Sequence, residues 1–344
     1  HLKKHIKISQ ATVIILIMIL FIPFFLDNKI LAETSNRLWA NDVIVFSDSE
    51  DVTSAPEMVS TPEGAAIVAW SEVGGASGLD IKVQKVDQNG NLLWGSGGIV
   101  ICNATGDQSE VKMVSDGKGG AILTWGDDRD GSSDRNIYAQ RVDKDGNDLW
   151  TTNGVPISTA TDIQQTPVII SDESSGAIIA WQDYRDDPAY SAVYVQRVDL
   201  NGSALWTSNG VAIAVISNVN VFFPKLVTDG NHGVLIAWSD DRNVTGEEDI
   251  FAQRVNEGGN VLWTTNGVVV SNATGRQISP YLISDNNGGG IITWNYSNTA
   301  GTVYDIYAQR INGSGVSQWT SNGLLIQGSS NYELISSMIN DGSN

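Results

Sequence analysis

A recurring Asp-x-Arg pair is the most regular charged pattern in this sequence. A carboxylate two residues before a guanidinium can bind an acidic or hydroxylated ligand, or form an ion pair that holds the fold together. We favour a structural ladder, within one repeat or to arginines such as Arg141, Arg197 or Arg254, because an active site breaks a repeat rather than copying it. The candidate binding pairs are Asp127 with Arg129, Asp183 with Arg185, and Asp240 with Arg242.

The segment DKDGND offers a second kind of chemistry. Its carboxylates Asp143, Asp145 and Asp148 alternate in the way that oxygen ligands surround Ca²⁺. The corresponding segments elsewhere read DQNGN, DLNGS and NEGGN, so the pattern occurs once. A glycine hairpin is therefore the favoured interpretation, and calcium is the one cofactor that the sequence leaves open.

The residues needed for nucleophilic catalysis or zinc binding are scarce. The three histidines are His1 and His5, in the N-terminal segment, and His232, in a predicted turn. Neither a Ser-His-Asp triad nor a histidine-ligated zinc site can be built from them. Cys102 is the single cysteine, so it can form no intramolecular disulfide and has no histidine to activate it. We therefore predict that the protein is not an enzyme.

Net charge and the N-terminal segment bear on location. A net charge of -19 argues against nucleic acid as a partner, because phosphate binding needs clustered lysine and arginine. Three lysines precede the apolar run 11–26, which has the length of a signal peptide and is short for a membrane span. We predict a signal peptide over residues 1–32, with an uncleaved anchor as the alternative. The protein is then secreted or held at the cell surface, and contacts a membrane only through this segment.

The tryptophans indicate which elements must position these side chains. All 11 fall into two columns that recur every 55 to 57 residues, with a glutamine column between them. We expect the tryptophans to form the core between repeats, and the glutamines to be half-buried and bonded to the backbone of the adjoining repeat. The columns are Trp70, Trp125, Trp181, Trp238 and Trp294; Trp39, Trp94, Trp150, Trp206, Trp263 and Trp319; and Gln84, Gln140, Gln196, Gln253 and Gln309.

Each repeat reads as four short strands joined by turns rich in Asp, Asn and Gly. The second strand is almost continuously apolar, as in AIIAW, which is typical of a strand buried on both faces. A single four-stranded meander cannot cover both of its faces, so neighbouring repeats must stack. We predict an all-β fold, a β-propeller of four-stranded antiparallel blades, with a β-solenoid as the alternative.

The repeat also predicts domain boundaries. Residues 33–344 would form one propeller domain, with five complete blades and partial strands at 37–46 and 334–344. The last partial repeat lacks its second and third strands, and the first residue is not Met, so we expect a C-terminally truncated sequence. The five repeats are 47–102, 103–158, 159–214, 215–271 and 272–327.

The segment from Gly119 to Ser158 resembles the repeats of about 55 residues found in secreted bacterial β-propeller-like surface proteins, a resemblance that covers roughly residues 37–344. Within it, VDKDGNDLW looks like the hairpin of quinoprotein-type propeller repeats. It is also similar to the sialidase Asp box, although the spacing of Asp143, Gly146 and Trp150 departs from that motif. The resemblance implies a propeller hairpin and carries over no catalytic residue.

These observations predict a non-catalytic, secreted or surface repeat protein that acts as a binding or display scaffold. Its partner would be an extracellular protein or a glycan. The alternative is a glycan-processing propeller enzyme, sialidase-like or lyase-like, whose signature would be paired carboxylates that converge on a central channel. The sequence shows carboxylates only at repeated loop positions or in single turns.

Overall fold

The chain forms an all-β structure built from repeated sheets. The computed structural model describes residues 55–74, 78–244, 246–298, 304–328 and 338. Within these ranges there are 20 strands in five antiparallel four-stranded sheets, and no helix, so none that could span a membrane. The predicted propeller-type fold is confirmed, and the antiparallel sheets are incompatible with a solenoid of parallel coils. The predicted signal peptide, the strand at 37–46 and, except for Met338, the strand at 334–344 lie outside the described residues.

Each sheet is one blade of four consecutive strands, paired in chain order from an inner strand to an outer edge strand. Blade 1 contains β1 (Glu57–Ser60), β2 (Ala66–Gly74), β3 (Gly78–Val86) and β4 (Ile99–Cys102); blade 2 contains β5 (Gln108–Ser115), β6 (Ala121–Asp127), β7 (Asn136–Val142) and β8 (Val155–Ser158); blade 3 contains β9 (Gln164–Ser171), β10 (Ala177–Asp183), β11 (Ala192–Val198) and β12 (Val211–Ala214); blade 4 contains β13 (Val221–Thr228), β14 (Val234–Val244), β15 (Glu247–Val255) and β16 (Val268–Ser271); blade 5 contains β17 (Arg276–Ser284), β18 (Gly290–Ser297), β19 (Tyr304–Ile311) and β20 (Leu324–Gln327).

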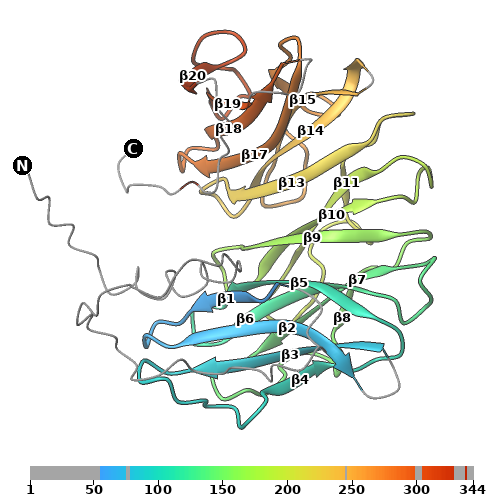
Figure 1. Ribbon diagram of the computed structural model, residues 1–344, viewed down its shortest axis with the longest axis vertical. Coiled ribbons are helices and arrows are strands. Elements are labelled where there is room, and N and C mark those ends of the chain that lie inside the picture. Colours follow the sequence, from blue (N-terminus) through green and yellow to red (C-terminus); the bar gives the residue numbers. More distant parts are fainter. Residues whose placement is uncertain (1–54, 75–77, 245, 299–303, 329–337, 339–344) are drawn as a thin grey trace, which may run out of the picture.

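The blades stack in the order of the chain. Figure 1 shows the sheets following one another from β1–β4 at the bottom to β17–β20 at the top. Each inner strand contacts the inner strand of the next blade, from β1 through β5, β9 and β13 to β17. The side chains of these inner strands therefore face a common central region, which is where a propeller has its axis.

The first tryptophan column forms the core of the blades, as predicted. Its five indoles are at most 1% exposed. The ring of Trp181 lies against Gly210. A Cβ at this position would lie 2.6 Å from the ring, and the φ of +92° is one that glycine adopts readily and other residues rarely do. The equivalent glycines of the other blades, Gly98, Gly154, Gly267 and Gly323, pack against Trp70, Trp125, Trp238 and Trp294.

The second tryptophan column joins one blade to the next, which confirms the expected blade-to-blade role. The indole N–H of Trp150 donates to the carbonyl oxygen of Leu200, in the β11–β12 hairpin of the following blade, at 3.0 Å. Gly202 of the same hairpin lies over the Trp150 ring. Trp206 and Trp263 bond the next hairpins in the same way, so one polar contact is repeated along the stack.

The glutamine column differs from expectation in its partners. Gln140 is fully buried rather than half-buried. Its amide donates to the carbonyl of Thr151 at 2.9 Å, and its oxygen accepts from the backbone N–H groups of Arg141 and Trp150. All three partners belong to the same blade, so this column closes the hairpin between the third and fourth strands instead of joining neighbours.

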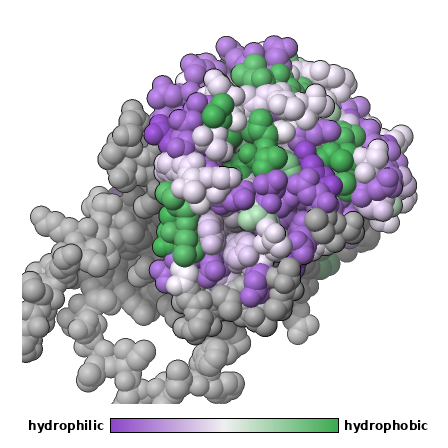
Figure 2. All heavy atoms as spheres, turned by 90° about the horizontal axis from the view of Figure 1, so that it is seen from above, coloured by the Kyte–Doolittle hydropathy of each residue, from purple (hydrophilic) through white to green (hydrophobic). Residues whose placement is uncertain are grey.

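Blade 5 presents a more apolar surface than the preceding blades. At the third position of the outer strand, Ile101, Ile157 and Ile213 are at most 3% exposed, whereas Ile326 is 57% exposed. Ile101, Ile157 and Ile213 are each covered by the blade that follows in the chain, whereas within the described residues no blade covers β20. Figure 2, seen from the end at which β17–β20 lie in Figure 1, shows apolar patches between polar areas.

Candidate functional site

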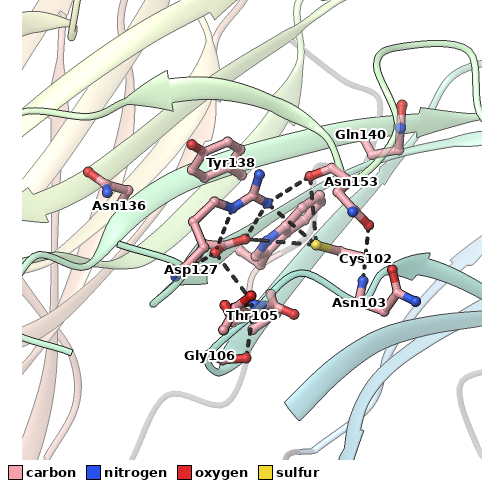
Figure 3. Close-up of polar contacts among 12 residues, drawn as sticks. Cys102, Asn103, Thr105, Gly106, Asp127, Asn136, Tyr138, Gln140 and Asn153 are labelled. Atoms are coloured by element: carbon pink, nitrogen blue, oxygen red, sulfur yellow. Dashed lines mark hydrogen bonds and ion pairs between the residues drawn. The ribbon is translucent and has the colours of Figure 1, made fainter. Parts of the chain in front are cut away.

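The Asp-x-Arg pairs lie at the end of the second strand in blades 2 and 3 and within it in blade 4, and each ion pair forms inside one blade. Asp127 accepts from the indole N–H of Trp125 at 2.7 Å, and from the backbone N–H and the Nε of Arg129 at 3.0 and 2.9 Å. The guanidinium lies 3.7 Å from the ring centroid of Tyr138 and donates to the carbonyl of Asn153 at 2.8 Å (Figure 3). Both carboxylate oxygens of Asp127 are therefore already bonded inside the blade.

Blades 3 and 4 repeat this arrangement. Asp183 accepts from Trp181 and Arg185, and Asp240 accepts from Trp238 and Arg242. The aspartates of all three pairs are fully buried, and the side chains of their arginines are 16% to 20% exposed. A charge buried in this way is stable only when it is paired, which this geometry provides. The structure thus places all six candidate residues in intrablade ion pairs.

The arginines suggested as alternative partners belong to a second column. Arg141 pairs with Asp116 at 2.9 Å, and its Nη1 donates to the carbonyl of Leu200 in the next blade at 3.2 Å. Arg197 and Arg254 make the same contacts with Asp172 and Asp229 and with the hairpins that follow. This column joins each blade to the next, and the Asp-x-Arg arginines add contacts to the preceding blade, since the Nη2 of Arg185 donates to the Oγ of Ser158 at 3.0 Å.

The candidate calcium ligands Asp143, Asp145 and Asp148 are not brought together as a cage. The Asp143 carboxylate accepts from the backbone N–H groups of Asp145 and Asn147, both at 2.9 Å, and so caps its own hairpin. Asp145 pairs with Lys144 at 2.7 Å on the surface. In the described part of the chain, no three acidic, histidine or cysteine side chains converge as metal ligands.

Cys102 lies beside the buried ion pair of blade 2 (Figure 3). Its sulfur is 3.9 Å from an oxygen of Asp127 and 3.5 Å from the Nη2 of Arg129. Burial raises the pKa of the thiol to about 12, and the neighbouring Asp127 carboxylate adds to that rise. The side chain is therefore a neutral, packed thiol, at a position that Ser158 and Ser271 occupy in other blades.

A cavity of about 270 Å³ lies between the inner strands. We refer to it as the central cavity. Figure 1 shows the inner strands β5, β9 and β13, from which most of its lining comes, running beside one another. Its lining residues are Ala55, Glu110, Val111, Lys112, Thr166, Pro167, Val168, Phe223, Pro224 and Lys225.

The inner strands β5, β9, β13 and β17 each contain a strained bulge, and the first three of them line the central cavity. One residue of each bulge takes a left-handed backbone angle, with φ of 58° at Glu110, 51° at Thr166, 52° at Phe223 and 52° at Ser279. Such values are rare for a β-branched or bulky side chain and cost about 1–2 kcal/mol each. In blades 3 to 5 a buried proline follows, and proline is tolerated at bulges because it needs no ladder hydrogen bond there. Bulges turn side chains toward a site, and strain of this kind concentrates at functional sites.

Two cationic side chains near the central cavity, Lys112 and Arg135, form ion pairs with glutamates. Lys112 forms an ion pair with Glu57 of the neighbouring inner strand. Glu110 accepts from the backbone N–H of Thr166 at 2.7 Å and lies 3.7 Å from the guanidinium of Arg135. The carboxylates near the cavity are thus engaged with Lys112, Arg135 and backbone.

Lys225 is different, because no acidic side chain among the described residues pairs with it. Its ammonium lies 5.4 Å from the ring centroid of Tyr281, on the next inner strand. Burial lowers the pKa of Lys225 from its ordinary value, the positive charge of Lys112 lowers it further, and the carboxylate of Glu57 acts in the opposite direction. Glu57 forms its ion pair with Lys112, so these two lysines have one carboxylate between them and the central cavity keeps an excess of positive charge at Lys225.

An exposed aromatic ring stands two residues before this lysine. Phe223 is 59% exposed and lies 6.0 Å, between ring centroids, from Phe222. Both Phe223 and Lys225 line the central cavity. Aromatic faces accept the apolar face of a sugar ring. Among the described tryptophans, those of the first column are buried in the blade cores, and those of the second column are buried at blade junctions except Trp263 and Trp319, which are partly exposed.

Sequence reasoning missed this site because it followed the residues that repeat. The cavity column, at equivalent positions of the five inner strands, reads Glu57, Lys112, Val168, Lys225 and Tyr281. Its side chains change in charge and size from blade to blade, while the tryptophan and glutamine columns stay constant. A variable column inside an otherwise regular repeat was the available signal.

No family model matches the sequence, and no curated protein matches it either. The resemblance to secreted surface repeat proteins therefore has no support from a sequence relative. Among solved structures, the chain is similar to an ulvan lyase of polysaccharide lyase family 25 bound to -[GlcA(1-4)Rha3S]-, with a TM-score of 0.53, 12% identity, and coverage of 76% of this chain and 68% of that one.

Two further solved structures are similar at lower scores. One is a protein of unknown function from Dyadobacter fermentans, with a TM-score of 0.46, 10% identity, and coverage of 79% of this chain and 82% of that one. The other is an α-L-arabinofuranosidase of Fusarium graminearum, with a TM-score of 0.43, 11% identity, and coverage of 78% and 79%.

The prediction that the protein is not an enzyme is contradicted by these comparisons. The ulvan lyase, whose fold this chain shares, is an enzyme. The prediction rested on the scarcity of histidines and on carboxylates that repeat from blade to blade, and neither observation excludes an enzyme. What the chain shares with the lyase is the β-propeller fold.

Proposed function

We propose that this protein is a glycan-processing propeller enzyme that acts in the central cavity. The observation that carries the proposal is the break in repeat symmetry there. Side chains that only support the fold recur at equivalent positions, whereas those of the cavity column change from blade to blade. The fold shared with an ulvan lyase supports the same conclusion.

The group types around the central cavity suit cleavage of a glycosidic bond. In the cavity column, beside the lining residues, Tyr281 and the ion-paired Glu57 are the groups that can exchange a proton with a bound sugar, as general acid–base catalysis requires. Lys225 supplies a fixed positive charge, which stabilises negative charge that develops during bond cleavage. Phe223 offers an apolar face against which a sugar ring can pack. These roles belong to four side chains from β1, β13 and β17.

The Asp-x-Arg pairs are poorer candidates for this chemistry. The carboxylate oxygens of Asp127, Asp183 and Asp240 already accept hydrogen bonds from an indole and a guanidinium in their own blade. A ligand would have to displace these bonds and leave buried charges unpaired. We assign the pairs to the stability of the blades.

We also propose that the protein works outside the cell. The apolar run at 11–26, preceded by Lys3, Lys4 and Lys7, supports export through a signal peptide. Polymeric glycans are then available to an open central cavity.

The test is cleavage of a polysaccharide panel by the full chain, containing both neutral arabinans and uronate-containing polymers, with products identified by mass spectrometry. We expect the Lys225→Ala variant to lower kcat/KM about tenfold or more, since a charge-assisted bond contributes about 1.5–3 kcal/mol. Lys118→Ala, which removes the same charge from an exposed turn, is the matched control and should leave cleavage unchanged. Absence of products from every polymer would contradict the proposal. So would full activity in a folded Phe223→Ala/Lys225→Ala double variant.

A further inference from the structure

The charge distribution at the central cavity points to a class of substrate. The chain as a whole carries a net charge of -19, so a site that attracts an anion needs a local positive charge. Lys112 and Arg135 do not supply it, because Glu57 and Glu110 neutralise them. Lys225 does, because the nearby Glu57 forms its ion pair with Lys112, and no carboxylate of the described residues forms one with Lys225.

Lys225 also lies where its surroundings disfavour its positive charge. Its side chain is half-buried, and Lys112 lies close enough to repel it. A half-buried ammonium gains most from an anion that comes to lie beside it, because the desolvation cost has already been met during folding. The protein therefore keeps an unfavourable charge where a ligand can neutralise it.

The neighbouring side chains limit what that anion can be part of. Phe223 and Lys225 are separated by one residue, Pro224, and the bulge at Phe223 lets both line the cavity. An apolar ring next to an ammonium matches a sugar that has an apolar ring face and an anionic substituent at its edge. A free inorganic anion would make no use of the exposed phenyl ring.

We propose that the central cavity selects an acidic glycan, and that Lys225 binds the anionic substituent of the sugar while Phe223 packs against its ring. This inference deepens the proposed function and rests on it. A uronate carboxylate and a sulfate ester present the same chemistry to Lys225, and the experiment separates the two.

The experiment measures binding of oligosaccharides to the full chain by calorimetry. Its three ligands are an oligogalacturonide, the methyl ester of that oligogalacturonide, which has the same rings without the charges, and a sulfated galactan oligosaccharide. The variants are Lys225→Ala, Lys225→Arg, which keeps the charge, and Lys118→Ala, which removes an exposed lysine elsewhere.

We expect at least one acidic ligand to bind about tenfold or more tightly than the neutral ester, because one charge-assisted hydrogen bond contributes a binding free energy of that size. Lys225→Ala should remove this difference, Lys225→Arg should retain most of it, and Lys118→Ala should leave it unchanged. Preference for the oligogalacturonide identifies a carboxylate as the anion, and preference for the sulfated ligand identifies a sulfate ester.

Two results would overturn the inference in different ways. If neutral oligosaccharides bind as tightly as acidic ones and Lys225→Ala binds both normally, the inference is wrong while glycan processing stands. The second result is that the wild-type chain, shown to be folded by its circular dichroism spectrum, neither binds nor cleaves any glycan. The proposed function is then wrong, and so is the inference that rests on it.

Discussion

The indole N–H of Trp181 donates to the carboxylate of Asp183 at 2.7 Å, and this bond joins the tryptophan column of the core to the Asp-x-Arg column. The same carboxylate binds the backbone N–H and the side chain of Arg185. Trp125 with Asp127 and Trp238 with Asp240 repeat the contact, and in blade 1 Glu72 takes the aspartate's place and accepts from Trp70. The charged pairs are therefore part of how each blade core is closed.

Replacement of this aspartate should be severely destabilising. In Asp183→Ala the fully buried carboxylate is lost, so the indole of Trp181 has no acceptor and the guanidinium of Arg185 has no counterion, although it keeps its bonds to Ser158 and Asn209. We expect a loss of about 3–5 kcal/mol in the free energy of unfolding, measured by urea denaturation. Asp145→Ala, on an exposed hairpin, is the control and should be indistinguishable from wild type. Equal stability of the two variants would show that the buried pair contributes nothing.

Replacement of the arginine should cost less and should not affect ligand binding. In Arg185→Ala, Asp183 keeps its bonds to Trp181 and to the backbone N–H of residue 185. We expect a loss of about 1–3 kcal/mol in unfolding free energy, because the remaining carboxylate is only partly deprived of donors. Glycan binding, measured in parallel on a glycan array, should be retained. Loss of binding with unchanged stability would instead make the Asp-x-Arg pairs a ligand site.

A single added methyl group should disrupt a blade core. Gly210 has a φ of +92°, and a Cβ there would lie 2.6 Å from the Trp181 ring. We expect Gly210→Ala to lower the unfolding free energy by about 2–4 kcal/mol, through backbone strain together with overpacking. Gly117→Ala is a matched control, since that glycine also has a positive φ, +73°, but no atom within 4 Å of the added Cβ. Its cost should come from strain alone, and a cost equal to that of Gly210→Ala would refute the packing argument.

Relief of strain at an inner-strand bulge should stabilise the fold. Ser279 has a φ of 52° in the bulge of β17. We expect Ser279→Gly to raise the unfolding free energy by about 0.5–1 kcal/mol, because glycine adopts this angle without a steric cost although it loses more entropy on folding. A thermal melt that moves to lower temperature would show that the bulge is not strained.

The thiol of Cys102 should resist alkylation at neutral pH and couple to stability at alkaline pH. Its pKa is raised by burial to about 12, so at pH 8 iodoacetamide should label it only after the protein unfolds, as mass spectrometry can show. Because the folded pKa lies above the unfolded one, this group contributes stability below about pH 9, and that contribution is lost as the pH rises toward 12. Rapid labelling of the native protein at pH 8 would contradict the burial. Cys102→Ser, which reproduces the residue found at Ser158, should fold normally and abolish labelling.

Much of the fold could be predicted from the sequence, because its determinants are local and repeated. Alternating turns and short apolar runs specify strands and hairpins, and a tryptophan every 55 to 57 residues requires neighbouring units to pack together. The Trp150 contact with the next hairpin shows the kind of interaction that such a column implies. These features do not depend on where any blade lies around the axis.

The site was decided only by the tertiary structure. Glu57, Lys112, Lys225 and Tyr281 share one position of the repeat, which the sequence contains, but only the convergence of the inner strands shows that this position lies at the central cavity. The partners of Asp183 were equally undetermined, because an arginine two residues away and Arg197 on the next strand are both within reach in the sequence. Which one pairs with the carboxylate depends on the direction in which each side chain leaves its strand. Neighbouring side chains on a strand point to opposite faces, and the stacking of the blades then determines which face is buried and which meets the central cavity.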